Sequence, residues 1–242
     1  SDLFLIFKTM ITPEQNKEIT QYLISKNLPI DLVLEIKDHM IEQIESMENL
    51  TFEEAFEKVK ESWKEEFVYK FSFSRLKMIT KYEKNITQNI HSKILLNALF
   101  CIIPIFIITF IFGIYNKSLY LFLINTVYYF CVVVAFLTLL INYKIQKTTF
   151  AAYQKKISIY QKGASNLFVS VCFILIYNIL VFDHNKDINT FHKILNLEFS
   201  FNIIFELLTI YIYIFWWLLG LFYFLKYRKT IKELQNRINL KL

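Results

Sequence analysis

Four polar side chains stand inside long apolar stretches of this sequence: Thr109, Asn125, Asn178 and Glu206. A carboxyl group in hydrocarbon must be protonated or hydrogen-bonded, so Glu206 is expected to face other helices rather than lipid. At about 1.5 Å per residue from the ends of their stretches, all four lie in the outer third of a bilayer. Two interpretations fit this layer. It is either a pocket for an ion, a proton or a small ligand, or a set of interhelical hydrogen bonds that fixes helix register.

A second group of candidate chemical residues surrounds His39. Asp38, His39 and Glu42 share part of a helix surface, but a metal site needs at least three converging ligands. The other histidines lie far away in the sequence, so a solvated charged face is the preferred interpretation. The sequence also lacks a Gly-rich phosphate loop, a His-Glu-x-x-His motif and a nucleophile with a neighbouring base. We therefore predict no metal, no cofactor and a function other than catalysis.

The apolar stretches themselves predict membrane spans. Residues 94–115, 119–142, 166–182 and 199–225 each approach the roughly 20 residues that cross a bilayer core. The whole chain is 55% hydrophobic, and its three Gly and three Pro suit long helices. The expected fold is all-α: a polytopic membrane protein whose residues 94–225 form a four-helix transmembrane domain.

Residues 1–70 are expected to form a separate module of three helices. Thr12-Pro13-Glu14-Gln15 has an N-cap, a proline in the first turn and a Gln three residues after the cap. Pro29 begins a second apolar-periodic segment, and Thr51 with Glu54 forms another capping box before a third. Short amphipathic helices of this kind can bury each other's apolar faces, although the core would be small.

The charges divide the chain into two parts. Residues 1–92 contain 12 Lys and Arg against 16 Asp and Glu, whereas residues 93–242 contain 15 against 5. The positive charges lie beside the spans, which argues against direct binding of nucleic acid. The second and third predicted helices have an acidic outer surface. We expect this surface to bind a cytoplasmic protein or a second copy of the chain through Glu35, Asp38, His39, Glu42 and Glu45.

Residues 71–93 are expected to be a basic amphipathic connector, and residues 226–242 a basic tail. Such segments contact anionic lipid headgroups at the membrane surface. For the tail and the basic loop at residues 143–165, an alternative is that they dock on the acidic surface of the N-terminal module, within one chain or between protomers. The basic residues predicted at the membrane surface are Lys77, Lys81, Lys84, Lys155, Lys156, Arg228 and Lys229.

The orientation follows from the basic residues near the span ends. The connector, the loop between the second and third spans, and the tail together contain sixteen, against three in the other two loops. The positive-inside rule therefore places both termini in the cytoplasm. Frequent Ile, Lys, Asn, Phe and Tyr are typical of an AT-rich bacterial genome, so the expected location is a bacterial inner membrane.

The segment Leu34-Glu35-Ile36-Lys37-Asp38-His39-Met40-Ile41-Glu42-Gln43-Ile44-Glu45, followed by Thr51-Phe52-Glu53-Glu54-Ala55-Phe56, resembles the HAAS domain and the similar permease-prefix domain. The resemblance covers about 35 residues. It departs from those domains where Val59-Lys60-Glu61-Ser62-Trp63 prolongs the helix in place of a Leu-Gly-x-Pro turn. The resemblance implies a cytoplasmic interaction or signalling module on a membrane anchor.

Two functional hypotheses follow. The first is a non-enzymatic regulatory or accessory protein of the inner membrane, whose acidic N-terminal module mediates protein interaction or self-association. The second is a small transporter or channel-like protein that uses the polar layer around Glu206.

Overall fold

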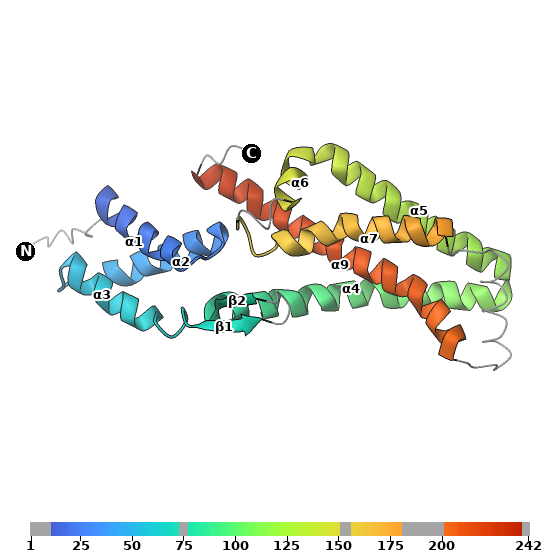
Figure 1. Ribbon diagram of the computed structural model, residues 1–242, viewed down its shortest axis with the longest axis horizontal. Helices are drawn as coiled ribbons and strands as arrows, with labels where there is room; N and C mark the ends of the chain where they lie inside the picture. Colours follow the sequence, from blue (N-terminus) through green and yellow to red (C-terminus); the bar gives the residue numbers. More distant parts are fainter. Residues whose placement is uncertain (1–10, 73–76, 151–155, 181–200, 239–242) are drawn as a thin grey trace, which may run out of the picture. The chain divides into compact units, whose positions relative to one another are not determined.

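The computed structural model describes residues 11–72, 77–150, 156–180 and 201–238, and the chain is mostly helical in these ranges (Figure 1). The elements are α1 (Pro13–Ser25), α2 (Ile30–Glu45), α3 (Phe52–Trp63), β1 (Tyr69–Ser72), β2 (Lys77–Thr80), α4 (Lys81–Tyr115), α5 (Lys117–Ile141), α6 (Tyr143–Phe150), α7 (Gln161–Leu180) and α9 (Phe201–Ile238).

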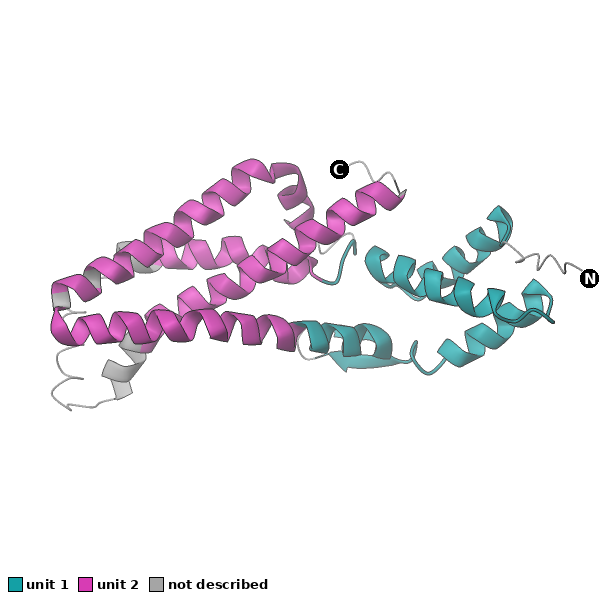
Figure 2. Cartoon of the chain, turned by 180° about the vertical axis from the view of Figure 1, so that it is seen from behind, with its two compact units in different colours: residues 1–90, 156–159 teal, residues 91–155, 160–242 magenta. Residues whose placement is uncertain are grey.

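The chain divides into two compact units, which Figure 2 shows in separate colours. Unit 1 contains residues 1–90 together with the short segment 156–159, and unit 2 contains residues 91–155 and 160–242. The N-terminal unit therefore includes four residues that the chain reaches only after α4, α5 and α6.

Local capping explains where two helices of unit 1 begin. The Thr12 hydroxyl accepts the Gln15 backbone N–H, and the Gln15 side chain accepts the Thr12 backbone N–H. Thr51 and Glu54 make the same reciprocal pair ahead of α3. Both capping boxes confirm the sequence prediction. Each satisfies backbone donors that the first turn of a helix leaves without a partner.

The core of unit 1 is built from the apolar faces of its helices. Ile19 and Leu23 of α1, Ile36 and Met40 of α2, and Phe56 of α3 are 2% exposed or less. The Tyr22 ring meets the Phe56 ring edge-on at a centroid distance of 5.8 Å. The spacings of three and four seen in the sequence thus correspond to the buried face of each helix.

The expected all-α fold and the expected connector at residues 71–93 need correction. Strands β1 and β2 pair as an antiparallel hairpin in which Tyr69 faces Thr80 and Ser72 faces Lys77. On β2, Ile79 is 1% exposed and its neighbour Met78 is 55% exposed, so these two adjacent side chains lie on opposite faces of the strand. Helix α4 then begins at Lys81, so part of the predicted connector belongs to a 35-residue helix.

Within the described ranges, three helices are long and apolar enough to cross a membrane: Lys81–Tyr115, Ser118–Ile141 and Leu208–Arg237. The first begins in unit 1 and continues into unit 2, and the other two belong to unit 2. The three helices contain most of the predicted first, second and fourth spans. Helix α7, at the predicted third span, has a shorter apolar described stretch, Gln161–Ile176. Helix α9 continues without a break through residue 238, so it includes most of the predicted basic tail.

Helices α7 and α9 pack very closely along their crossing (Figure 1). A Cβ atom at Gly220 of α9 would lie 2.3 Å from the backbone nitrogen of Leu167 in α7. A Cβ atom at Gly163 of α7 would lie 2.3 Å from the Tyr223 ring of α9. Each glycine therefore creates the space that lets the other helix approach.

Candidate functional site

The segment 156–159, which we name the strap, caps the beginning of α2. Pro29 is the N-cap residue of this helix and offers no side-chain cap. The backbone N–H groups of Ile30 and Asp31 instead donate to the carbonyl oxygens of Lys156 and Ile157, at 3.1 and 3.2 Å. Two donors that the helix geometry leaves unpaired thus find acceptors more than 120 residues later in the chain.

Asp31 holds the other end of the strap. Its Oδ2 atom accepts the Ile159 backbone N–H at 3.1 Å, and its carboxyl group also accepts the Ser158 hydroxyl. Its Oδ1 atom accepts the Leu32 N–H at 2.9 Å. Ile157 and Ile159 are 6% and 7% exposed. The strap is therefore both hydrogen-bonded and buried against unit 1.

Burial raises the pKa of the Asp31 carboxyl to about 6. The hydrogen bonds from Ser158, Ile159 and Leu32 act in the opposite direction, and the nearby Glu35 charge adds to the increase. Desolvation of the carboxylate by burial is the larger effect here. Asp31 thus has a pKa close to physiological pH.

Lys156 fastens the strap to a second helix end. Its Nζ atom donates to the Asn27 carbonyl oxygen at 2.6 Å. Asn27 lies just after α1 and has a left-handed φ of 56°, a conformation that Asn tolerates. The last carbonyl groups of a helix lack partners within the helix, so an outside donor can bind there. The end of α1 and the start of α2 are therefore both bound to the strap.

The predicted acidic interaction surface lies on α2. Glu35, Asp38, His39 and Glu42 are exposed, and Glu45 is partly exposed. His39 Nδ1 lies 3.6 Å from Glu42 Oε2, and the Tyr82 hydroxyl donates to Glu35 Oε1 at 3.5 Å. Within the described ranges, no group of three or more His, Cys, Asp and Glu could hold a metal ion.

Several of the basic residues predicted at the membrane surface have protein partners. Lys81 Nζ lies 2.7 Å from Glu66 Oε1, and this contact raises the pKa of Lys81. Lys229 Nζ lies 3.8 Å from Glu233 Oε1. Lys77 and Lys84 are partly exposed, and Lys155 lies outside the described residues. Lys81 and Lys156 therefore make contacts that stabilise the fold of unit 1.

The layer of polar residues predicted in the membrane is described only in part. The Thr109 hydroxyl of α4 is 2.8 Å from the Tyr211 hydroxyl of α9, and Tyr211 also bonds to Tyr120 of α5. All three residues are buried. Asn125 of α5 is partly exposed, and the side chains of Asn178 and Glu206 lie outside the described residues.

Sequence reasoning missed Tyr211, the partner of Thr109, and Tyr120, which bonds to Tyr211. Their positions in apolar helices gave the only signal, because buried tyrosine hydroxyls usually find hydrogen-bond partners. It also missed a buried polar group at α6, where Thr148 Oγ1 lies 2.6 Å from the Tyr227 hydroxyl. The Gln161 side chain donates to the Thr148 carbonyl oxygen at 2.6 Å. These contacts connect α6, α7 and α9.

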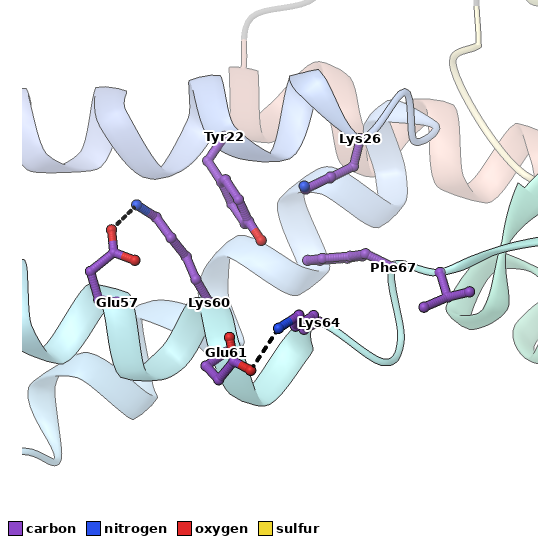
Figure 3. Close-up of a pocket in the computed structure, with 8 residues that line it drawn as sticks. Tyr22, Lys26, Glu57, Lys60, Glu61, Lys64 and Phe67 are labelled. Atoms are coloured by element: carbon purple, nitrogen blue, oxygen red, sulfur yellow. Dashed lines mark hydrogen bonds and ion pairs between the residues drawn. The ribbon is translucent and has the colours of Figure 1, made fainter.

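An open cavity of about 320 Å³ lies beside α1 and α3 in unit 1 (Figure 3). Lys26 Nζ lies 4.6 Å from the centroid of the Tyr22 ring and 5.9 Å from that of Phe67. Lys60 and Lys64 form ion pairs with Glu57 and Glu61 on the same helix. The complete lining comprises Tyr22, Lys26, Glu57, Lys60, Glu61, Lys64, Phe67 and Val68.

Comparison with protein-family models, with curated proteins and with solved structures found no match for this chain. The resemblance to the HAAS domain therefore stays a prediction from the sequence.

Proposed function

We propose that this chain is a non-enzymatic regulatory protein of a bacterial inner membrane. Its N-terminal helical module binds a cytoplasmic protein or a second copy of the chain, and four spans anchor it with both termini in the cytoplasm. The observation that carries the proposal is the strap. The module is completed by residues that directly precede α7, so a change in the module is linked through the chain to the spans.

The acidic surface of α2 supports a binding role for the module. Its carboxylates are exposed on the side of the helix opposite the core residues Ile36 and Met40. A surface of one charge steers an oppositely charged partner and contributes mainly to association rate and specificity. A basic partner is therefore expected.

The contacts of Thr109 favour this proposal over transport. Its hydroxyl is already occupied by backbone carbonyl oxygens of its own helix and by Tyr211. A satisfied interhelical hydrogen bond fixes packing and does not offer a free ligand for an ion.

The test is affinity purification of the intact protein in mild detergent, with recovery of the partner measured against the wild type. The double variant Glu35→Lys, Glu42→Lys should lose the partner, because both changes reverse charge on the exposed surface of α2. The matched control Glu14→Lys, Glu18→Lys reverses two exposed charges on α1 and should retain it.

The same purification separates the two functional hypotheses. Glu206→Gln should leave partner recovery unchanged if the membrane domain serves as an anchor. Equal recovery with the α2 and α1 double variants would contradict binding at the acidic surface. Proton-coupled uptake in proteoliposomes that is lost in Glu206→Gln would instead establish the transporter hypothesis.

A further inference from the structure

The cavity beside α1 and α3 has a charge arrangement that suits an anion. Lys60 and Lys64 are paired with carboxylates at 2.6 and 3.0 Å, whereas Lys26 makes no ion pair within the described part of the chain. Lys26 is partly exposed, and its ammonium group lies beside aromatic rings. An anion could therefore bind Lys26 without first breaking an ion pair, and such charge-assisted hydrogen bonds are among the stronger ones.

The aromatic wall of the cavity offers an apolar surface beside that cation. Tyr22 and Phe67 meet edge-on at a centroid distance of 6.0 Å, and Trp63 stacks on Phe67 at 5.7 Å. Figure 3 shows the Tyr22 and Phe67 side chains lying next to Lys26. Phe67 is 6% exposed, so this part of the wall is held in place by its neighbours.

The Tyr22 hydroxyl supplies a neutral donor at the same place. Burial and the Glu57 charge raise the pKa of Tyr22, so the hydroxyl keeps its proton at physiological pH. It makes no hydrogen bond within the described ranges, which leaves its proton available to a ligand.

The arrangement also disfavours a cation. Lys26 already lies over the Tyr22 ring, and Lys60 lies 4.0 Å from the Phe56 centroid and 5.5 Å from the Tyr22 centroid. A cationic ligand would have to displace these ammonium groups from the rings. The volume of about 320 Å³ lies at the small end of pockets that bind organic molecules, so the expected ligand is small.

We propose that this cavity binds a small organic anion with an aromatic or apolar body, held by Lys26 and the Tyr22 hydroxyl. The site stands independently of the acidic surface on α2, so it can exist whether or not that surface binds a protein. Such a ligand would act on the module directly, because the residues of the cavity belong to α1, α3 and the segment that follows α3.

The test uses the full chain in zwitterionic nanodiscs and follows 4-fluorophenyl phosphate by fluorine NMR relaxation, with empty nanodiscs as the blank. Lys26→Gln should weaken binding about tenfold, the effect of losing one charge-assisted hydrogen bond. Glu57→Gln should strengthen binding, since it removes a negative charge and frees Lys60. Lys58→Gln, an exposed change on the same helix outside the cavity, should have no effect.

Two further probes define the ligand class. Inorganic phosphate should compete weakly because it lacks the apolar body, and 4-fluorobenzyl trimethylammonium should not bind. Equal binding of the cationic probe would overturn the proposal, as would equal affinities for Lys26→Gln and Lys58→Gln with unchanged helical circular dichroism. No binding of the aryl phosphate would overturn it too.

Discussion

The Asp31 carboxyl group both accepts a hydrogen bond at the start of α2 and binds the strap. It accepts N–H groups from Leu32 at the start of its own helix and from Ile159 at the end of the strap. Carboxylates are favourable at helix N-termini, but burial opposes ionisation. The balance leaves the pKa of Asp31 at about 6, compared with its ordinary value of 3.8.

Strap binding should consequently depend on pH. A carboxyl group whose pKa rises on binding favours the bound state below its free pKa, and that contribution is lost as pH rises through its bound pKa. Here the window runs from about 4 to about 6. Within it, protection of the Ile159 amide from hydrogen exchange, corrected for intrinsic exchange rates, should increase about tenfold per pH unit on acidification.

Asp31→Asn is the decisive variant for this dependence. It retains an acceptor oxygen but does not titrate, so protection of Ile159 should be nearly constant across the window from about pH 4 to about pH 6. Asp38→Asn, a change at an exposed position of the same helix, should keep the wild-type profile. A wild-type profile in Asp31→Asn would assign the pH dependence to another group.

At the level of elements, the crossing of α7 and α9 depends on two glycines of unequal tolerance. The added methyl group of Gly220→Ala would meet the backbone of Leu167, which cannot move without shifting a helix. The methyl group of Gly163→Ala would meet the Tyr223 ring, so this clash involves a side chain and no backbone of the other helix. Gly220→Ala should destabilise the fold by about 1–3 kcal/mol, and Gly163→Ala by less.

Thermal unfolding in detergent measures this difference. Alanine has a higher helix propensity than glycine, so any loss of stability in either variant comes from the crossing itself. A melting temperature for Gly220→Ala at or above that of Gly163→Ala would show that the two helices can separate at little cost.

The elements that the sequence predicted are those with local signals. The two capping boxes each join residues three positions apart, so a short stretch of sequence predicts them: Thr12 with Gln15, and Thr51 with Glu54. The strap joins residues more than 120 positions apart, and no local pattern marks it. The hairpin was missed because basic residues interleaved with Phe71 and Ile79 fit both an amphipathic surface segment and alternating strands.

At the level of the whole molecule, the number of crossings decides where the C-terminus lies. Three helices have the length and apolar character of a span in the described ranges, and α7 has a shorter described apolar stretch. If α7 also crosses, as we propose, Lys147 and Lys232 lie on the same side of the membrane. If it does not, the two residues lie on opposite sides.

Single cysteines at these positions test the proposal in a variant whose Cys101, Cys131 and Cys172 are replaced by alanine. Lys147→Cys and Lys232→Cys should both resist a membrane-impermeant thiol reagent in intact cells and react after permeabilisation. Ser118→Cys, in the proposed outer loop, should react in intact cells. Labelling of Lys232→Cys without permeabilisation would rule out four crossings with a cytoplasmic C-terminus.

The strap also sets an order of events during synthesis. Ribosomes make the chain from its N-terminus, so α1, α2 and α3 emerge well before residues 156–159 exist. Until then, the first amides of α2 have only water as a partner. A nascent chain that stops after α6 contains every helix of the N-terminal module but lacks the segment that caps α2. The module can therefore be completed only after α4, α5 and α6 have been translated, although its own three helices are made first.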